Sequence, residues 1–389
     1  MPELMDNIVK NLNNETYSLY SCALVSRHWC KISIPILWQD PFSFSRRSPL
    51  FISNYFSSLS EYEKIILKEC GINEEFSKTI FDYARFLKAL NLSRLYFQVE
   101  KWIKLVLVNS NSRNDNRLKH KIIIDITNLL LKLLIENGAT LHSLDLCFSR
   151  CREFKPEIFY VLGQNEQFLS QLQYLSLSAI TFYIDIDSAT TWLKAVAKYT
   201  IKISTLDIEV YYLNYSQHIF RALINVIKSQ EQLRQFGITG VGYFTEFYGM
   251  ISTLESQKNS LQEFIIDSCA FNEEFECCND DDIPDEELKK RVMQFSEILP
   301  LTLQYLNFKL LLGPYIDILL NHCNVPLKKL LIYKIYDKKI AKALIEFCIR
   351  NKTLNYVGVY EYLYLDDNIR KEVEAYVELV PFERIRVCC

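Results

Sequence analysis

The sequence predicts an α/β fold in which short parallel strands alternate with helices in a stacked solenoid, behind a separate three-helix segment at the N-terminus. The first observation is a short pattern that recurs eight times: an apolar residue, two free positions, an apolar residue, one free position and an apolar residue. The second is a change to helical spacing between the copies. The third is a different helical motif before residue 40.

The eight copies are the most regular feature of the sequence. Their first residues lie between 24 and 42 positions apart. A period in this range is typical of stacked repeats, in which each unit buries its apolar stripe against its neighbours. The copies are Leu141-Leu144-Leu146, Leu172-Leu175-Leu177, Ile203-Leu206-Ile208, Leu233-Phe236-Ile238, Leu261-Phe264-Ile266, Leu303-Leu306-Phe308, Leu327-Leu330-Ile332 and Leu354-Val357-Val359.

Each copy predicts a strand, and the segment after it predicts a helix. In Leu144-Asp145-Leu146, apolar and polar residues alternate, which is typical of a strand with one buried face. Residues at helical spacing follow the third and seventh copies: Ala222, Leu223, Val226 and Ile227, and then Ile340, Ala343, Leu344 and Phe347. A strand–helix–strand connection predicts parallel neighbouring strands with the helices outside.

Two insertions interrupt the period. A ninth copy, Leu87-Leu90-Leu92, lies 54 residues before Leu141. We therefore expect a further unit around Trp102–Val108 and a polar insertion at about 109–121. The longest step contains an acidic insertion at about 270–287. Its composition is typical of a solvated loop, with a loop for a partner or for regulation as the alternative.

Composition and charge indicate an intracellular protein. The formal net charge of −3 gives no indication of a nucleic acid or a membrane as partner. The most apolar run, Ile122–Ile135, is too short to span a bilayer and predicts a buried helix. No secretory signal is recognisable, and the 12 cysteines show no disulfide framework. These features predict reduced thiols and a cytoplasmic or nuclear location.

No catalytic or cofactor motif is recognisable, so we expect a binding protein without metal or cofactor rather than an enzyme. Gly237, Gly240 and Gly242 follow a predicted strand, but their spacing does not fit a dinucleotide-binding loop. The five His residues show no metal-ligand spacing. An enzyme with an unrecognised site on the sheet is the last-ranked alternative. The terminal pair Cys388-Cys389 predicts a tail with two thiols, with a lipidation site as the alternative.

The repeats resemble the leucine-rich repeat family, in its long strand-plus-helix variety. The family signature continues with Asn or Cys three residues after the last apolar position. Only Cys269, in the fifth copy, matches it here. The repeats are therefore degenerate, and the spacing carries the resemblance. The resemblance implies a parallel sheet on the concave face of the solenoid and helices on its outside.

The N-terminal segment contains three short apolar stripes. They consist of Leu4, Ile8 and Leu12, then Leu19, Ala23 and Leu24, then Trp29 and Ile32. Pro2 suits the first turn of a helix, and Pro35 is expected to end the third helix. Three helices in fewer than 40 residues bury little surface alone. Some of these apolar residues should therefore dock on the rest of the chain or contact a partner.

This segment resembles the F-box, in the form common in fungal proteins. The matching residues are Pro2-Glu3-Leu4, Ile8, Leu12, Ala23-Leu24-Val25-Ser26-Arg27-x-Trp29 and Pro35-Ile36-Leu37-Trp38. The resemblance implies that the segment binds the Skp-type adaptor of a cullin–RING ubiquitin ligase. The implied contact residues are Pro2, Leu4, Ile8, Leu24, Val25 and Trp29, while Leu12, Ile32 and Trp38 would be internal. Plain helical core is the alternative for each contact residue. The family usually has an apolar residue before the proline, a position that Met1 would fill.

The side chains between the apolar strand positions are the expected substrate-binding surface. They include Asp145, Tyr174, Ser176, Asp207, Glu209, Glu263, Asp267, Tyr305, Asn307, Lys309, Lys329, Tyr333, Tyr356 and Tyr360. Acidic groups dominate the early and middle copies, and Lys and Tyr dominate the last three. This predicts a substrate that is basic toward the N-terminal units and meets an aromatic, cationic patch near the C-terminus. An ordinary solvated sheet face is the alternative.

Together these features predict a non-catalytic substrate-recognition subunit of an SCF-type cullin–RING ubiquitin ligase. Residues 1–40 would be the F-box, 41–84 a connecting segment packed on the first repeats, and 85–389 the leucine-rich repeats. The adaptor, the cullin–RING scaffold bound to it and an unidentified protein substrate would be the partners. The alternative is an interaction scaffold of leucine-rich repeats whose F-box is only structural, and adaptor binding distinguishes the two.

Overall fold

The computed structural model describes most of the chain, in two compact units. The described residues are 2–12, 15–43, 48–107, 116–147, 162–178, 186–210, 217–240, 249–250, 252–267, 285–308, 315–335 and 337–385. Unit 1 consists of Met1–Leu175 and Tyr183–Ala195, and unit 2 consists of Ser176–Phe182 and Val196–Cys389. The division falls inside the predicted repeat region. The two predicted insertions lie largely outside the described residues, as do Met1, Lys309, Cys388 and Cys389.

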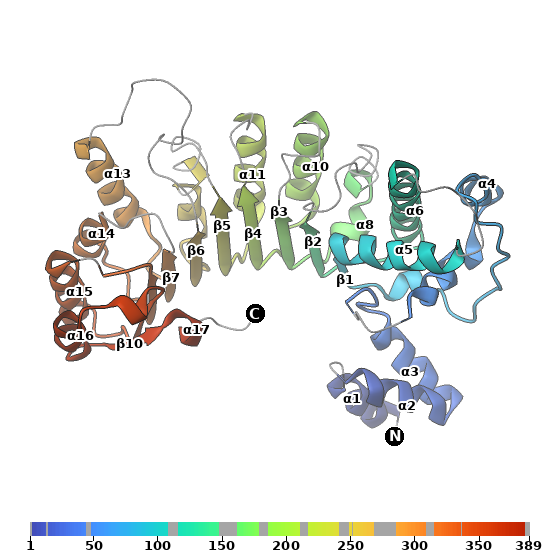
Figure 1. Ribbon diagram of the computed structural model, residues 1–389, viewed down its shortest axis with the longest axis horizontal. Coiled ribbons are helices and arrows are strands. Elements are labelled where there is room, and N and C mark those ends of the chain that lie inside the picture. The colour runs from blue at the N-terminus through green and yellow to red at the C-terminus, as the bar shows by residue number, and fades with distance from the viewer. Residues whose placement is uncertain are drawn as a thin grey trace. The chain divides into compact units, whose positions relative to one another are not determined.

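Ten strands form one sheet in which the strands follow one another in chain order (Figure 1). Each pair with a defined register is parallel, which confirms the predicted α/β fold with a parallel sheet. The strands are β1 (Ala89–Asn91), β2 (Ser143–Cys147), β3 (Tyr174–Ser178), β4 (Thr205–Val210), β5 (Gln235–Gly240), β6 (Glu263–Asp267), β7 (Tyr305–Phe308), β8 (Lys329–Ile332), β9 (Tyr356–Val359) and β10 (Glu378–Pro381). The first nine coincide with the nine copies of the pattern, and β10 has none.

The middle apolar residue of each copy belongs to a buried ladder across the strands. In unit 2 the ladder consists of Leu206, Phe236, Phe264, Leu306, Leu330, Val357 and Leu379, each in register with the next. All seven are buried. Because side chains alternate along a strand, the residues beside each ladder position point to the opposite face. We call that opposite face, which points away from the ladder and from the helices packed on it, the outer face of the sheet.

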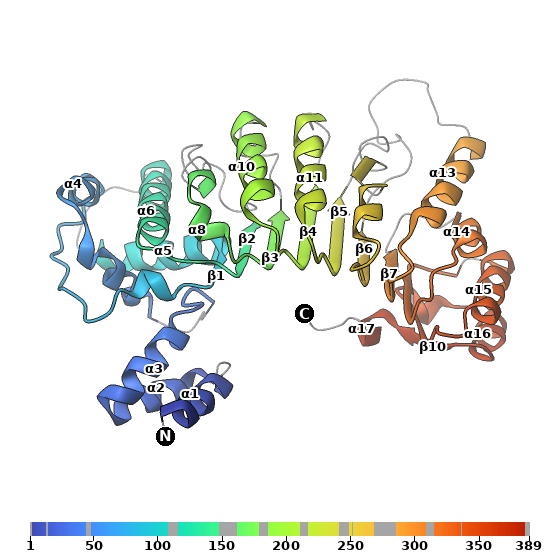
Figure 2. The same cartoon turned by 180° about the vertical axis from the view of Figure 1, so that it is seen from behind.

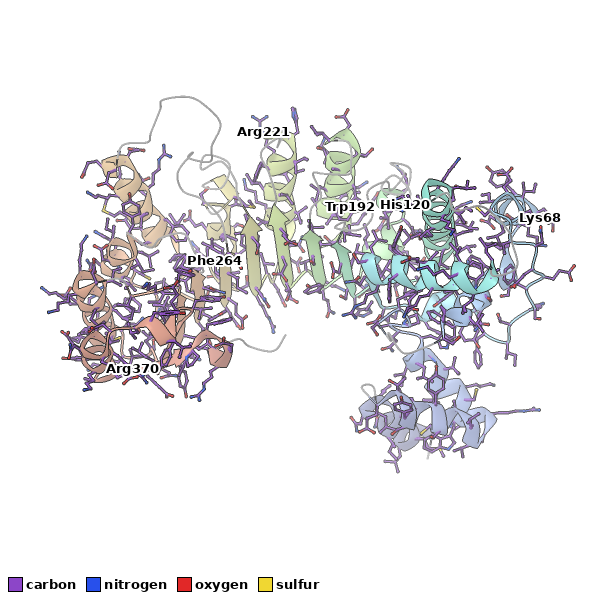
Figure 3. The ribbon with its side chains drawn as sticks, viewed as in Figure 1. Lys68, His120, Trp192, Arg221, Phe264 and Arg370 are labelled. Carbon is purple, nitrogen blue, oxygen red and sulfur yellow. The ribbon has the colours of Figure 1, made fainter. Side chains whose placement is uncertain are left out.

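Phenylalanine rings join the ladder face of unit 2 to its helices. Figure 3 labels Phe264 of the ladder. The ring of Phe295 in α13 lies 6.2 Å from that of Phe264 and 6.0 Å from that of Phe308. The helical elements of unit 2 are α11 (Gln217–Ser229), η3 (Leu254–Gln257), α13 (Asp285–Ile298), α14 (Ile316–His322), α15 (Lys338–Arg350), η5 (Tyr362–Tyr364), α16 (Asp367–Glu374) and α17 (Phe382–Ile385). The apolar residues predicted to form helix faces in α11 and α15 are all buried.

Side chains also tie consecutive repeats together through hydrogen bonds to backbone carbonyls. The buried Gln230 Nε2 donates to Thr200 O (2.9 Å), and Gln257 Nε2 donates to Ile227 O (3.0 Å), each thirty residues back. Arg350 Nη2 donates to Leu320 O over the same separation. In unit 1, Asn165 Nδ2 donates to Ile135 O over the same separation. These bonds satisfy carbonyls near the ends of the preceding helices, which have no intrahelical partner.

In unit 1 two helices lie between the first two strands. The helical elements of this unit are α1 (Pro2–Asn11), α2 (Thr16–Val25), α3 (Arg27–Leu37), η1 (Pro49–Ser58), α4 (Glu61–Glu69), η2 (Tyr83–Phe86), α5 (Leu92–Val106), α6 (Asn116–Glu136), α8 (Glu166–Leu169) and α10 (Ile186–Tyr199) up to Ala195. The predicted buried helix Ile122–Ile135 is part of α6. No further strand lies around Trp102, because α5 extends to Val106 and β1 pairs directly with β2. The extra unit predicted there is therefore wrong.

The three N-terminal helices form where the apolar stripes predict them. Ser26 separates α2 from α3 in an extended conformation, and its hydroxyl accepts a hydrogen bond from the Trp29 amide (3.3 Å) as the N-cap of α3. Pro35 does not end α3, contrary to the prediction. It lies in the last turn, where Trp38 N still donates to Ile34 O (3.1 Å), so the helix continues to Leu37.

The connecting segment 41–84 packs against α5 and α6. The Trp102 indole N–H of α5 donates to Ser53 Oγ (3.0 Å), and the Trp102 ring lies 5.2 Å from that of Phe56. Glu63 of α4 accepts from Lys132 Nζ of α6 (3.3 Å). Aromatic packing and an ion pair whose carboxylate is buried therefore hold this segment on α5 and α6. No helix in the described residues is long and apolar enough to cross a membrane.

Candidate protein-interaction surfaces

Apolar side chains that match the adaptor-binding motif lie in solvent on α1 and α2. Leu4 is 64% exposed, Ile8 45%, Leu24 87% and Val25 68%. Trp29 is half-buried. Pro2 is the first residue of α1, and its side chain is not among those that the structure describes. Exposed aliphatic side chains in this number on two short helices are typical of a surface that a partner covers.

Other apolar residues of the same helices form their internal core. Val9, Leu19 and Leu37 are buried, while Leu12 and Ile32 are half-buried. Trp38 is buried as predicted, with its ring 3.9 Å from that of Tyr83. The helices therefore have a core without Leu4, Leu24 and Val25.

Two tyrosines extend this exposed surface and are absent from the predicted contact set. Tyr17 is 85% exposed and Tyr20 is 40% exposed. Together with Leu24 they occupy positions i, i+3 and i+7 of α2, which is one face of a helix. That spacing is the signal by which they could have been found. We call Leu4, Ile8, Tyr17, Tyr20, Leu24 and Val25 the N-terminal apolar surface.

The predicted substrate residues of unit 1 and of the first part of unit 2 lie on the outer face and are half-buried or buried. Asp145, Tyr174, Asp207, Glu209, Glu263 and Asp267 are half-buried, and Ser176 is buried. In unit 1, Asn91 Nδ2 donates to Asp145 Oδ2 from the neighbouring strand. In unit 2 a Cβ on Gly237 would collide with the carboxylate of Asp207, so the glycine makes room for that group.

The carboxylate of Glu263 lies in a mixed environment. Burial raises its pKa above the ordinary value, and the positive charge of Lys329 opposes that shift. In register, Glu263 faces Tyr305, which in turn faces Lys329. This acidic group is therefore less easily ionised than an exposed glutamate, because burial penalises its charged form.

Toward the C-terminus an apolar cluster occupies part of the outer face, among the residues predicted to form an aromatic, cationic patch. Tyr305 is only 6% exposed and Asn307 is also buried. Tyr305 belongs to a cluster with Leu331, Val380 and Ile385, and Ile265, Tyr360 and Phe382 pack against it. Lys329, Tyr333 and Tyr360 are half-buried, and Tyr356 is 40% exposed.

Two apolar triplets in the sequence could have revealed this cluster. Most copies alternate apolar and polar residues, but Phe264-Ile265-Ile266 and Leu330-Leu331-Ile332 are unbroken. Alternation along a strand places Ile265 and Leu331 on the outer face. An apolar residue there requires a cover, and α17 supplies it.

Polar and aromatic groups border this cluster. The rings of Tyr333 and Tyr360 lie 6.3 Å apart, and that of Phe382 stacks on Tyr360 at 4.0 Å. Glu361 forms an ion pair with Lys334 (2.8 Å). Hydrogen bonds from Lys334 and Tyr333 hold the pKa of Glu361 below its usual range.

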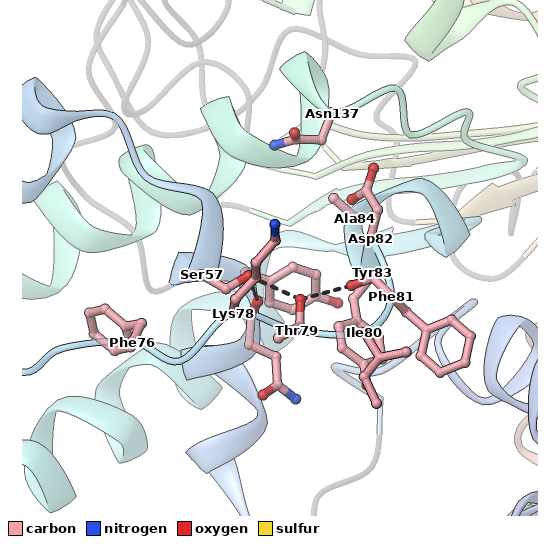
Figure 4. Close-up of a pocket in the computed structure, with 12 residues that line it drawn as sticks. Ser57, Phe76, Lys78, Thr79, Ile80, Phe81, Asp82, Tyr83, Ala84 and Asn137 are labelled. Carbon is pink, nitrogen blue, oxygen red and sulfur yellow. Dashed lines mark hydrogen bonds between the residues drawn. The ribbon is translucent and has the colours of Figure 1, made fainter.

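A cavity of about 470 Å³ lies in unit 1, between the connecting segment and the end of α6 (Figure 4). Its polar lining groups bond one another: Ser57 Oγ lies 3.1 Å from Thr79 Oγ1, which donates to Phe81 O (2.9 Å). Within the described ranges, no three His, Cys, Asp or Glu side chains gather as a metal site requires.

Comparison of the chain with models of known protein families gave no match, and comparison with curated proteins gave no significant match.

Proposed function

We propose that this protein is a substrate receptor of a cullin–RING ubiquitin ligase. Its three N-terminal helices would bind a Skp-type adaptor in the manner of an F-box, and its repeats would hold a protein substrate. The observation that carries the proposal is the exposure of Leu4, Ile8, Leu24 and Val25. These are four of the residues that match the F-box contact positions.

The exposure of these side chains supports a binding role over a purely structural one. Had they served as helical core, they would be buried, as Val9, Leu19 and Leu37 are. Burying exposed aliphatic side chains against a partner contributes roughly 25 cal/mol per Å². Tyr17 and Tyr20 would add aromatic area, which is frequent at the centre of protein interfaces.

The outer face supports a protein substrate rather than a small molecule. Its acidic part is a row of half-buried groups, with Asp207 and Glu209 on β4 and Asp267 on β6, on either side of β5. Carboxylates arranged in this way suit a basic segment of a protein substrate, by charge complementarity.

Co-purification with a Skp-type adaptor tests the adaptor part of the proposal. The wild-type chain should form a one-to-one complex. The variant Leu4→Glu/Leu24→Glu/Val25→Glu should lose it, because charged groups would enter an apolar interface. Ile80→Glu/Leu363→Glu is the matched control. These two residues are 93% and 91% exposed but lie elsewhere in the chain, so the control should still bind.

The alternative is an interaction scaffold whose N-terminal helices do not engage a ligase. A folded wild-type chain that fails to bind the adaptor at micromolar concentration would favour that alternative. The substrate part has its own test, in which Asp207→Lys/Glu209→Lys should lose crosslinks to basic segments of captured proteins. Crosslinks that are unchanged would remove the acidic row from the proposed substrate site.

A further inference from the structure

The last described turn of the chain lies on the outer face of unit 2. The helices that contact the ladder lie on one side of the strands, and α17 lies on the other (Figures 1 and 2). Ile385 is 3% exposed and packs with Leu331 and Val380, while the Phe382 ring stacks on Tyr360. Glu383 and Arg384, between these two anchors, are exposed.

A recess at Gly358 makes room for this turn on the sheet. Leu331, Gly358 and Val380 are neighbours in register across β8, β9 and β10. Because Gly358 has no side chain, it leaves a recess between Leu331 and Val380. A Cβ at this position would collide with Leu331 Cδ1 and would stand 2.9 Å from Ile385 Cδ1, closer than such atoms pack. We call the recess formed by Leu331, Gly358 and Val380, with Tyr305 and Tyr360, the outer-face socket.

The turn in the socket is separable from the repeat core. The ladder residues Leu330, Val357 and Leu379 point to the side of the sheet opposite to α17, so we expect them to keep their contacts when α17 leaves. The turn has four residues, and of these Phe382 and Ile385 pack against the apolar cluster of the outer face. Segments with few buried contacts open locally at a small fraction of the cost of global unfolding.

We propose that the outer-face socket binds a segment of a partner protein in which an aromatic and a branched aliphatic residue lie three positions apart on one helical turn. In the free protein α17 occupies the socket and competes with that segment. The inference rests on the proposed function in that this face receives a protein partner, but it does not depend on the adaptor. A partner segment would place its aromatic ring on Tyr360 and its aliphatic side chain over Gly358. Such aromatic and aliphatic anchors are the usual basis of helix-in-groove recognition.

Competition by α17 sets the apparent affinity of the site. A partner binds only when the turn is displaced, so its apparent dissociation constant rises as the open fraction falls. Replacement of Phe382 and Ile385 should therefore strengthen the binding of a separate peptide that has the sequence of α17. Loss of Glu383 and Arg384 should not, because both point to solvent.

The test uses the full chain and a fluorescent peptide with the sequence of residues 379–387. Phe382→Ser/Ile385→Ser should bind the peptide at least about tenfold more tightly than the wild type. Glu383→Ser/Arg384→Ser should match the wild type, and a peptide with serine in place of Phe and Ile should bind neither. A folded Phe382→Ser/Ile385→Ser chain that does not bind the peptide would overturn the proposal.

Hydrogen exchange on the wild-type chain tests the same proposal independently, in case the Phe382→Ser/Ile385→Ser variant does not fold. The amides of residues 383–385 should exchange faster than those of β8 and β9, as a removable turn requires. Equal protection of α17 and β8 would show that the turn is a permanent part of the core, and the proposal would fall. Adaptor binding is measured through a different surface, so failure of this site and failure of the proposed ligase role are distinguishable.

Discussion

Ile385 of α17 packs beside Leu331 in the space that Gly358 of β9 leaves open on the outer face of the sheet. The two residues are 27 positions apart in the sequence, and β10 between them pairs in register with β9. The chain therefore passes through its last strand and turns back across the opposite face. A residue without a side chain in β9 and a branched side chain after β10 form one packing unit.

Gly358→Ala should disturb this unit. The added methyl group would collide with Leu331 and Ile385, and overpacking of this kind costs about 1–3 kcal/mol. We expect faster hydrogen exchange in α17 and a lower midpoint of unfolding for unit 2. The control is Gly249→Ala, whose added Cβ would meet Ile224 Cδ1 at an ordinary 3.8 Å. Unchanged exchange in α17 of Gly358→Ala would show that the recess can accept a side chain.

Gln230→Leu should destabilise the junction between two repeats. Gln230 Nε2 donates to the carbonyls of Thr200 and Val226, and its Oε1 accepts from the Ile203 amide (2.9 Å each). Leucine would remove all three bonds, although Val226 O would still accept from Ser229 Oγ (2.9 Å). Each buried backbone group that is then left without a partner costs about 1–3 kcal/mol. The Ile203 amide should lose its protection in hydrogen exchange.

Gln232→Leu is the matched control for this junction. Gln232 is exposed two residues further along the chain, so its replacement should leave exchange at Ile203 unchanged. If Gln230→Leu also leaves that amide protected, the bond between repeats contributes little to the stability of unit 2.

The ladder could be predicted from the sequence because it follows from residue type and spacing alone. The middle residue of every copy of the apolar pattern lies on a strand, since each ladder position needs a large apolar side chain. The last strand was missed because its flanking positions break the pattern. Tyr376 is 52% exposed, and Pro381 occupies the position of the third apolar residue.

The candidate surfaces were harder to predict, because exposure depends on packing between distant segments. The motif that contains Leu24 and Val25 identified residue types, but only the packing of α2 on α3 decides which of them remain in solvent. The burial of Tyr305 depends on the reversal of the chain after β10. The bonds from Gln230 and Gln257 to the preceding repeat have no pattern in residue type, since other repeats use Asn165 or Arg350 instead.

Glu63→Gln should remove a pH-dependent part of the stability of unit 1. Desolvation acts to raise the pKa of Glu63, but hydrogen bonds from Ser60 and Lys132 outweigh it and place the pKa below the ordinary value of 4.5. A lowered pKa in the folded state contributes stability that is fully present above the unfolded value and lost as the pH falls through the folded value. We expect a cost of about 1–3 kcal/mol at pH 7 that becomes smaller as the pH falls below 4.5.

Tryptophan fluorescence during urea unfolding can measure this cost. All four tryptophans (Trp29, Trp38, Trp102 and Trp192) belong to unit 1, so the signal reports that unit. Glu61→Gln is the control, because its ion pair with Lys64 is exposed and such pairs contribute little. A difference between Glu63→Gln and the wild type that is the same at pH 7 and pH 3 would contradict the assignment to ionised Glu63.

The rate of alkylation should differ among the described cysteines according to their burial. Cys22 of α2 and Cys30 of α3 are half-buried, whereas Cys323 and Cys348 are buried. Burial raises the pKa of Cys348 to about 11 and that of Cys323 above its ordinary value. At pH 8 only about one Cys348 thiol in a thousand would be the reactive thiolate, and access would slow its reaction further.

Iodoacetamide added to the native chain at pH 8 should therefore label Cys22 and Cys30 before Cys323 and Cys348, as mapped by peptide mass spectrometry. Raising the pH to 9 should increase the rate at Cys348 about tenfold, because its thiolate fraction rises in proportion to pH well below the pKa. Labelling in urea should remove the difference between the two pairs. Early labelling of Cys348 in the native chain would mean that α15 leaves its place against the sheet on the timescale of the reaction.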